Sequence, residues 1–252
     1  MIPGRRTLLI GLGAGALAGR ATAAPPLLTA TEIVRRAHVA AGGAAWMRPR
    51  TLIMNGQGVF FPKGDQASRI AVPDYKMWRV YPAQSTDAHA ANGMVRIDAK
   101  FADGRTYFQT AFDGVDTYDQ TGKRPAAQAS REWSENFGFG IIRFALDAGF
   151  TLDRLPDDSA DGRAMHVIRV NDPQGSKTLF GIDSRDHQIL WLGFATPRGW
   201  HERRYSNFYR RRGVSFTQPG LVRLYYDGVK QNEITWTDYQ VNEPIDPAMF
   251  RL

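Results

Sequence analysis

The stretch that decides the fold is Asp103-Gly104-Arg105-Thr106-Tyr107-Phe108-Gln109-Thr110-Ala111-Phe112-Asp113-Gly114. Between its two Asp-Gly pairs it is rich in β-branched and aromatic residues, as is typical of a strand. Successive strand side chains point to opposite faces, so Phe108 and Phe112 share one face while Tyr107 and Gln109 share the other. Asp-Gly favours a tight hairpin turn because glycine adopts positive φ without steric cost. The stretch therefore predicts one strand of an antiparallel meander.

The same two-residue period occurs along most of the chain. Predicted strands span residues 52–62, 74–81, 93–101, 105–112, 163–170, 177–183, 188–194, 202–209, 213–217, 222–226 and 233–241. Turn signals such as Asp172-Pro173-Gln174-Gly175 and Asp227-Gly228 separate them, and no linker divides the series. We expect one α+β domain built on a single antiparallel sheet of about ten or eleven strands.

Two helices are expected, over residues 29–46 and 131–148. In the first, apolar residues recur at spacings of three and four, Thr29 or Thr31 can act as N-cap, and Gly42-Gly43 ends or loosens the helix. The second has a bulky apolar face but contains two interior glycines, each of which costs roughly 1 kcal/mol relative to alanine. A marginal helix of this kind needs a partner surface and can also move away from it.

Two helices cannot cover a sheet of this size. A sheet that long must curl, which predicts a half-open barrel whose concave face is only partly filled. The alternation places bulky apolar residues on one face throughout, so we expect either a self-packed core or an apolar cavity that holds a ligand. Core packing is the simpler interpretation of any one aromatic side chain. The predicted ligand-binding set comprises strand residues, with two isoleucines of the second helix as a lid: Trp78, Phe108, Phe112, Phe180, Trp191, Phe208, Leu224, Tyr226 and Trp236, with Ile141 and Ile142.

The composition limits the chemistry. The chain has 252 residues, of which 43% are hydrophobic, and no cysteine, which excludes disulfides, cysteine-ligated metals and thiol catalysis. The formal charge of +7 at first suggests a nucleic-acid partner.

The N-terminus changes this interpretation. Arg5-Arg6 precedes a stretch rich in Gly, Ala and Leu, and Ala21-Thr22-Ala23 forms a small-residue cleavage site. This arrangement predicts a twin-arginine-like signal peptide over residues 1–23, followed by one domain over residues 24–252. Its removal takes away three arginines and leaves a charge of +4. We therefore expect no nucleic-acid partner but a soluble periplasmic protein, without a lipid anchor because no cysteine stands at the cleavage site.

Other candidate chemistry is sparse. The five histidines have no metal-ligand spacing, and no cofactor motif is present, so neither a metal nor a cofactor is predicted. Residues 183–187 are interpreted as a hairpin turn. An exported hydrolase or lyase that uses His166 or His187 with a nearby aspartate remains an alternative. A third possibility is an interaction module, in which Arg203-Arg204 and Arg210-Arg211-Arg212 contact an envelope protein or an anionic membrane surface. Such a basic run is also typical of a solvated sheet edge.

Several segments carry a resemblance to a known family. They are Ala40-Ala41-Gly42-Gly43, Asn55-Gly56-Gln57-Gly58, the hairpin over residues 182–189, Arg204-Tyr205-Ser206-Asn207-Phe208 and the ending over residues 241–250. Together they resemble the LolA/LolB-like superfamily of outer-membrane lipoprotein-sorting and related periplasmic proteins. The resemblance implies a strongly curved half-barrel with helices across its mouth and a hydrophobic ligand inside. We expect a non-catalytic periplasmic carrier or sensor of a lipid, acyl chain or other apolar ligand. Lipoprotein transfer is not carried over, because the chain is longer than a typical lipoprotein chaperone and lacks a lipidated cysteine. The family's lid arginine is not carried over either, because no matching motif is present.

Overall fold

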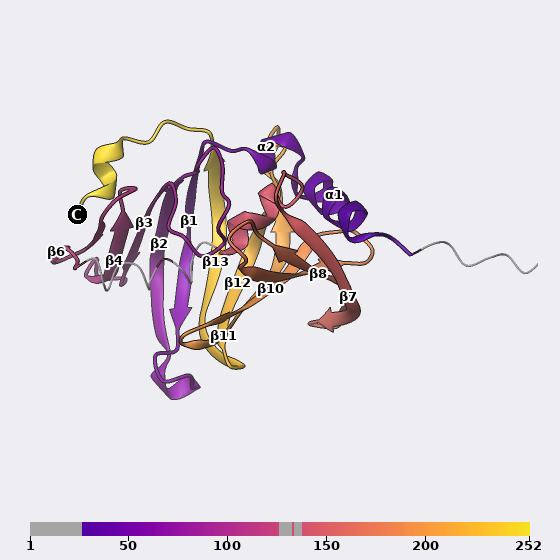
Figure 1. The fold of residues 1–252 in the computed structure, drawn as a ribbon. Helices are drawn as coiled ribbons and strands as arrows, with labels where there is room; N and C mark the ends of the chain where they lie inside the picture. The colour runs from indigo at the N-terminus through magenta and orange to yellow at the C-terminus, as the bar shows by residue number, and fades with distance from the viewer. Residues whose placement is uncertain (1–26, 126–132, 134–137) are drawn as a thin grey trace, which may run out of the picture.

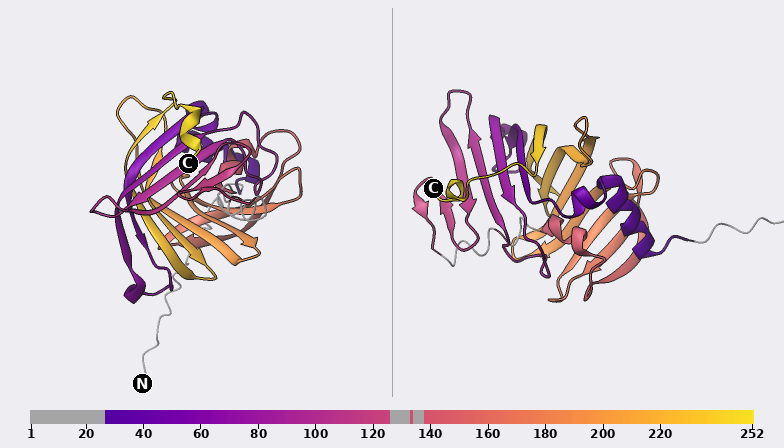
Figure 2. Two further views of the ribbon diagram at one scale, coloured as in Figure 1. Left: turned by 90° about the vertical axis from the view of Figure 1, so that its left-hand side faces the viewer. Right: turned by 90° about the horizontal axis from the view of Figure 1, so that it is seen from above.

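The computed structural model describes residues 27–125, 133 and 138–252. Its strands are β1 (Thr51–Phe60), β2 (Ile70–Val80), β3 (Met94–Lys100), β4 (Thr106–Phe112), β5 (Thr117–Asp119), β6 (Gly122–Lys123), β7 (Thr151–Ala160), β8 (Arg163–Asn171), β9 (Lys177–Asp183), β10 (Ile189–Thr196), β11 (Gly199–Tyr209), β12 (Gln218–Tyr226) and β13 (Val229–Val241). They form one sheet of 13 strands in the order β6-β5-β4-β3-β2-β1-β13-β12-β11-β10-β9-β8-β7, and every neighbouring pair is antiparallel. Strands β6 and β7 form the two edges, so the sheet curves without closing into a barrel (Figures 1 and 2).

The helical elements are α1 (Ala30–Ala41), α2 (Ala44–Met47) and the 3₁₀ helices η1 (Gln66–Ser68), η2 (Gly138–Phe144) and η3 (Pro247–Phe250). Thr29 is the N-cap of α1, where its Oγ1 accepts a hydrogen bond from the Glu32 amide at 3.2 Å. Gly42 ends α1 with φ of 134°, and a Cβ there would lie 2.3 Å from the Ser215 carbonyl oxygen. Both the predicted cap and the predicted break at Gly42-Gly43 are confirmed.

Several elements differ from the prediction. Residues 213–217 form a loop rather than a strand, and this loop buries Phe216. Strand β7 was not predicted because it contains Pro156, which a sheet accepts at an edge, where a missing N–H costs no ladder bond. The short strands β5 and β6 were also missed. Within the predicted second helix, Trp133 is helical as predicted, and residues 138–144 form the 3₁₀ helix η2 instead of an α-helix. Residues 131, 132 and 134–137 lie outside the described residues.

The helices divide between the two faces of the sheet. Helix α1 contacts β7, β8 and β9, and α2 contacts η2, so these elements cover one half of the concave face (Figure 2). Helix η3 lies on the other side, where the Arg96 guanidinium on β3 donates to the Met249 carbonyl oxygen at 2.9 Å. On the other half of the concave face, the helical residue Trp133 packs against Val95 of β3 and Phe112 of β4. Among the described residues, no helix is long and apolar enough to cross a membrane.

Two polar contacts hold η2 against the first helices. The His38 ring donates from Nε2 to the Ile142 carbonyl oxygen at 2.7 Å, and burial lowers the pKa of this histidine, which keeps the ring neutral. The Arg48 guanidinium donates to the Arg143 carbonyl oxygen at 3.2 Å and pairs with Asp147 at 2.8 Å. Because these bonds satisfy carbonyls at the end of η2, they position its side chains over the sheet.

Candidate functional site

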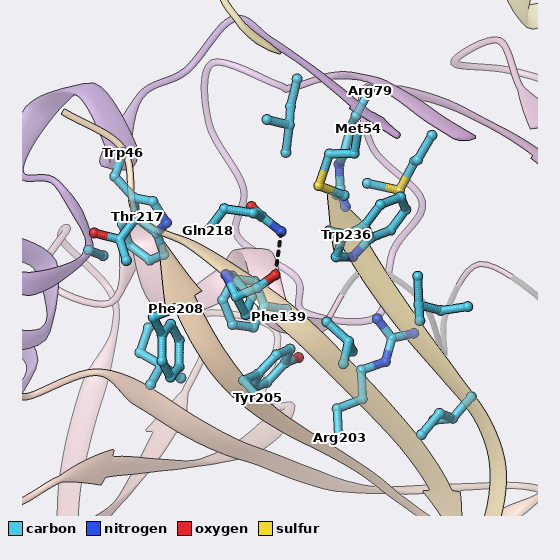
Figure 3. A pocket seen from close by; sticks show the side chains of 18 of the residues that line it. Trp46, Met54, Arg79, Phe139, Arg203, Tyr205, Phe208, Thr217, Gln218 and Trp236 are labelled. Carbon is cyan, nitrogen blue, oxygen red and sulfur yellow. Dashed lines mark hydrogen bonds between the residues drawn. The ribbon is translucent and has the colours of Figure 1, made fainter. Parts of the chain in front are cut away.

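A cavity of about 200 Å³ lies on the concave face where the two halves of the sheet meet. Strands β1, β2, β3, β11, β12 and β13 form its walls, and α2 and η2 contribute to its cover (Figure 3). Most of its lining is apolar or aromatic and includes Trp46, Met54, Phe139, Phe208, Ile234 and Trp236. The site is therefore a largely apolar cavity, of the kind that takes an apolar ligand.

The charged side chains among the described lining residues are all arginines. Arg79 of β2, Arg143 of η2 and Arg203 of β11 line the cavity, and its described lining contains no Asp, Glu or His. The other polar lining residues carry neutral amide or hydroxyl groups, as in Gln218 and Thr217. Three guanidinium groups therefore line an otherwise largely apolar cavity.

Arg143 is the most deeply placed of the three, with 4% of its surface exposed. Its guanidinium carbon lies 4.5 Å from the ring centroids of both Trp46 and Tyr81. Burial lowers the pKa of Arg143, and the neighbouring Tyr81 hydroxyl partly offsets this effect. Contacts with aromatic faces thus replace part of the hydration that the charge has lost.

Arg79 contacts the same aromatic ring, that of Tyr81. Its guanidinium carbon is 4.9 Å from the Tyr81 centroid. Protein surrounds the side chain although part of its surface faces the cavity. This burial lowers the pKa of Arg79 to about 10, opposed by Tyr81 and assisted by the positive charges of Arg143 and Arg203.

Hydrogen bonds link Arg203 to His201 and His201 to Tyr226. Its Nε donates to His201 Nε2 at 3.1 Å, so His201 carries its proton on Nδ1, which lies 3.1 Å from the Tyr226 hydroxyl oxygen. Burial, assisted by the charge of Arg203, lowers the pKa of His201 to about 2. A neutral imidazole therefore orients the arginine.

Three predicted ligand-binding residues line this cavity: Phe208, Leu224 and Trp236. Ile141 and Ile142 do not; both are buried in the core beneath η2, whereas Phe139 and Arg143 of the same helix reach the cavity. The prediction assumed an α-helix with 3.6 residues per turn. A 3₁₀ helix has three residues per turn, so different residues point toward the sheet.

The remaining six predicted residues lie around the cavity or on the outer face. Phe180 is fully buried against Phe139, Phe112 packs on Trp133, and Phe108 contacts Phe60 and Tyr75. Tyr226 supports His201 as described above. These four belong to the inner packing around the site rather than to its wall.

Trp78 and Trp191 lie on the outer face. Trp78 pairs across strands with Arg96, whose guanidinium carbon is 5.7 Å from its ring, and Trp191 stacks on Trp200. On β2 the residues that face the cavity are Met77 and Arg79. The prediction assigned the face of Trp78 to the cavity because tryptophan is usually buried and arginine is usually exposed to solvent.

Sequence reasoning missed the three cavity arginines. The available signal was the two-residue period itself, which places Arg79 on the same face as Tyr75 and Met77. The predicted basic run also divides between the two faces. Arg203 lines the cavity, whereas Arg204 forms ion pairs with Glu202 and Asp161.

The polar clusters predicted from sequence lie away from the cavity. His166 Nδ1 is 3.1 Å from Asp157 at the β7–β8 edge, and neither His166 nor His187 lines the cavity. The segment over residues 183–187 is a turn in which Asp183 accepts the Arg185 and Asp186 amides, as predicted. Across the described ranges, no three His, Asp or Glu side chains are grouped as a metal site. The acid–base pair that the hydrolase alternative requires is thus not found in the described cavity lining.

Comparisons with known proteins identify the fold. No family model and no curated protein matches the sequence. A domain assigned to an outer membrane lipoprotein-sorting protein from Vibrio parahaemolyticus matches with a TM-score of 0.52 and 10% identity, over 87% of this chain and 94% of that one. A LolA superfamily protein from Nitrosomonas europaea matches with a TM-score of 0.52 and 12% identity, over 90% of this chain and 99% of that one. The chain therefore has a LolA-like fold, and identities this low extend to the fold alone.

Proposed function

We propose that this LolA-like chain is a periplasmic carrier or sensor that holds a lipid acyl chain or another apolar ligand in the cavity and performs no chemistry on it. The observation that carries the proposal is the cavity itself, which has apolar walls from both halves of an open sheet and a cover that is not part of the sheet. A ligand placed there removes apolar surface from water at roughly 25 cal/mol per Å².

The cavity dimensions favour a slender ligand. Its volume of about 200 Å³ is below the roughly 300–1,000 Å³ of sites for drug-sized molecules. A single alkyl chain fits such a space better than several chains or a fused ring system. Each methylene group buried contributes about 0.8 kcal/mol.

The cover offers a route of entry. Helix η2 is attached to α1 and α2 through the His38 and Arg48 hydrogen bonds to its carbonyl oxygens. Movement of η2 and α2 away from the sheet would expose the Phe139 side of the cavity without breaking any strand pair. The predicted signal peptide, which lies outside the described residues, supports export, and an envelope protein or an anionic membrane surface is the proposed exchange partner.

The test is ligand analysis of protein purified from its native envelope. We expect mass spectrometry of the extracted protein to show an alkyl-chain molecule, and the delipidated protein to bind a fluorescent alkyl probe. Val222→Phe, which fills the cavity, should weaken probe binding. Leu221→Phe on the adjacent position of β12 does not enter the cavity lining and is the matched control. Absence of both extracted ligand and probe binding would overturn the proposal.

A further inference from the structure

A pair of tryptophans occupies the outer face of the sheet, away from the cavity. Trp191 of β10 and Trp200 of β11 have ring centroids 6.4 Å apart and planes inclined by 29°. Both side chains are partly exposed, and neither lines the cavity. Trp191 packs against a small cluster that includes Met165, whereas Trp200 belongs to no apolar cluster among the described residues. Apolar packing within the described part of the chain therefore does not account for Trp200.

Gly193 allows the two rings to lie along the sheet. It follows Trp191 by two residues, so both are on the same face of β10, and it pairs with Glu202 of β11. A Cβ at Gly193 would meet Trp191 Cη2 at 2.5 Å and Trp200 Cζ2 at 2.6 Å, so the far edges of both indoles meet above this glycine. The rings cover Gly193, which is buried, and together they form one aromatic surface.

Hydrogen-bonding groups surround this surface. Neither indole nitrogen has an acceptor among the described residues and neither is fully buried, so both N–H groups can donate to a ligand. Glu202, opposite Gly193, accepts from the Arg204 guanidinium through one carboxylate oxygen at 2.5 Å. Arg204 also pairs with Asp161 and lies 4.9 Å from the Tyr225 ring. The aromatic surface is therefore edged by donors and acceptors whose charges have both signs.

This combination matches the two sides of a sugar ring. One face of a pyranose presents C–H groups, which pack on the electron-rich face of an indole, while its hydroxyls lie around the rim. A membrane fits less well, because the rings lie along the sheet instead of projecting from it and the carboxylates of Glu202 and Asp161 oppose anionic lipid. We propose that the Trp191–Trp200 surface binds a glycan built of neutral pyranose units. The proposal goes beyond the carrier function and does not depend on the cavity.

The experiment titrates neutral oligosaccharides into the full chain. Binding of chitohexaose, cellohexaose and maltohexaose is followed by isothermal titration calorimetry, and saturation-transfer NMR identifies the sugar protons that contact the protein. We expect at least one of these sugars to bind, with the strongest transfer at its ring C–H groups. Trp200→Ala should weaken this binding by at least about tenfold, because the stacking contact is lost.

Further variants test the geometry of the surface. Gly193→Ala retains both indoles but places a methyl group against their edges, so it should displace them and weaken sugar binding. Trp78→Ala removes an indole from the outer face of β2 and is the matched control, which should bind the sugar like the wild type. Thermal melting checks that each variant folds, and Trp200→Ala serves alone if Gly193→Ala does not fold. Alkyl-probe binding should persist in these variants, because none of the three positions lines the cavity.

The possible results decide the proposal. If none of the oligosaccharides binds at millimolar concentration, the glycan proposal is overturned. Undiminished binding to folded Trp200→Ala would also overturn it, since the sugar would then bind elsewhere. Vesicles of phosphatidylglycerol that bind through Trp200, without any oligosaccharide binding, would assign the surface to a membrane instead. Each of these results leaves the carrier proposal intact, because the alkyl-probe measurement tests that proposal separately.

Discussion

Strand β11 places two adjacent arginines on opposite faces, and their surroundings differ. Arg204 points outward and forms ion pairs with Glu202 at 2.5 Å and Asp161 at 3.2 Å. Arg203 points inward, where its Nε donates to a neutral histidine and the described cavity lining contains no carboxylate. The same residue type is neutralised locally on one face and grouped with like charges on the other.

The contrast extends across the sheet. On the outer face Arg96 pairs with Asp98 at 2.8 Å, whereas Arg79 on the inner face contacts the Tyr81 ring. Outward charges meet partners within the chain, so they contribute to the folded state without any ligand. Inward charges are assembled around a space. The described contacts therefore differ by face: the outer arginines form ion pairs, whereas the inner arginines contact an aromatic ring and a histidine.

The largest expected difference between the faces is in packing. Phe180→Ala should lower the free energy of unfolding by about 3–5 kcal/mol, because it leaves a cavity at a fully buried position. Trp78→Ala on the outer face should cost less than this, since the ring is partly exposed and its removal leaves no enclosed cavity. Urea denaturation measures both values. Equal losses would contradict the assignment of the two faces.

The second effect is a pH dependence that arises from the inner face. His201 has a folded pKa of about 2 against 6.5 when unfolded. Between these values the unfolded chain binds the extra proton, so stability falls as the pH drops below 6.5. The loss from pH 8 to pH 5 should be about 2 kcal/mol.

Denaturation of the wild type and His201→Gln at both pH values tests this effect. The substitution keeps a polar side chain but removes the titrating group, so the stability of the variant should change less between pH 8 and pH 5. An identical pH dependence in the two proteins would show that another group is responsible.

The hairpins could be predicted from sequence, but the edge strand could not. Asp227-Gly228 joins β12 to β13 with Tyr226 opposite Val229, as its turn signal predicts. Strand β7 was missed although Asp161-Gly162 follows it, because Pro156 and the acidic pair Asp157-Asp158 disfavour a strand. These residues can form a strand here because β7 lies at the edge of the sheet, where proline costs no ladder hydrogen bond. The sequence alone does not show that this segment lies at an edge.

Alternation predicted which residues share a face but not which face is inner. On β2 the alternation correctly places Trp78 on one face and Met77 and Arg79 on the other. The prediction assigned the Trp78 face to the cavity, whereas Met77 and Arg79 line it. Burial of an arginine is rare enough that a single sequence favours the tryptophan. The cluster of Arg79, Arg143 and Arg203 exists only after η2 and β11 meet β2, so no local pattern contains it.

A third substitution should increase folding stability, although replacing a buried residue usually lowers it. Arg143→Met removes two buried donors without acceptors among the described residues while keeping a flexible apolar stem. We expect the ligand-free protein to become more stable by about 1 kcal/mol, because a buried charge without a counter-charge is costly. Chemical denaturation of delipidated protein measures this. Arg96→Met, which leaves the buried Asp98 without its ion pair, should instead lower stability. Loss of stability in both variants would show that Arg143 is already satisfied by the protein.

The smallest effect is expected on the outer face. Asp161 pairs with Arg204 and Arg223 at a turn position with φ of 49°, which asparagine also adopts readily. Asp161→Asn should therefore cost no more than about 1 kcal/mol, because solvent screens these partly exposed pairs. Most of that loss should disappear in 1 M salt, where the screening length falls to about 3 Å. Denaturation at low and high salt measures both changes, and alkyl-ligand affinity should be unaltered. A change in affinity would show that charge on the outer face reaches the cavity, so that the two faces do not act independently.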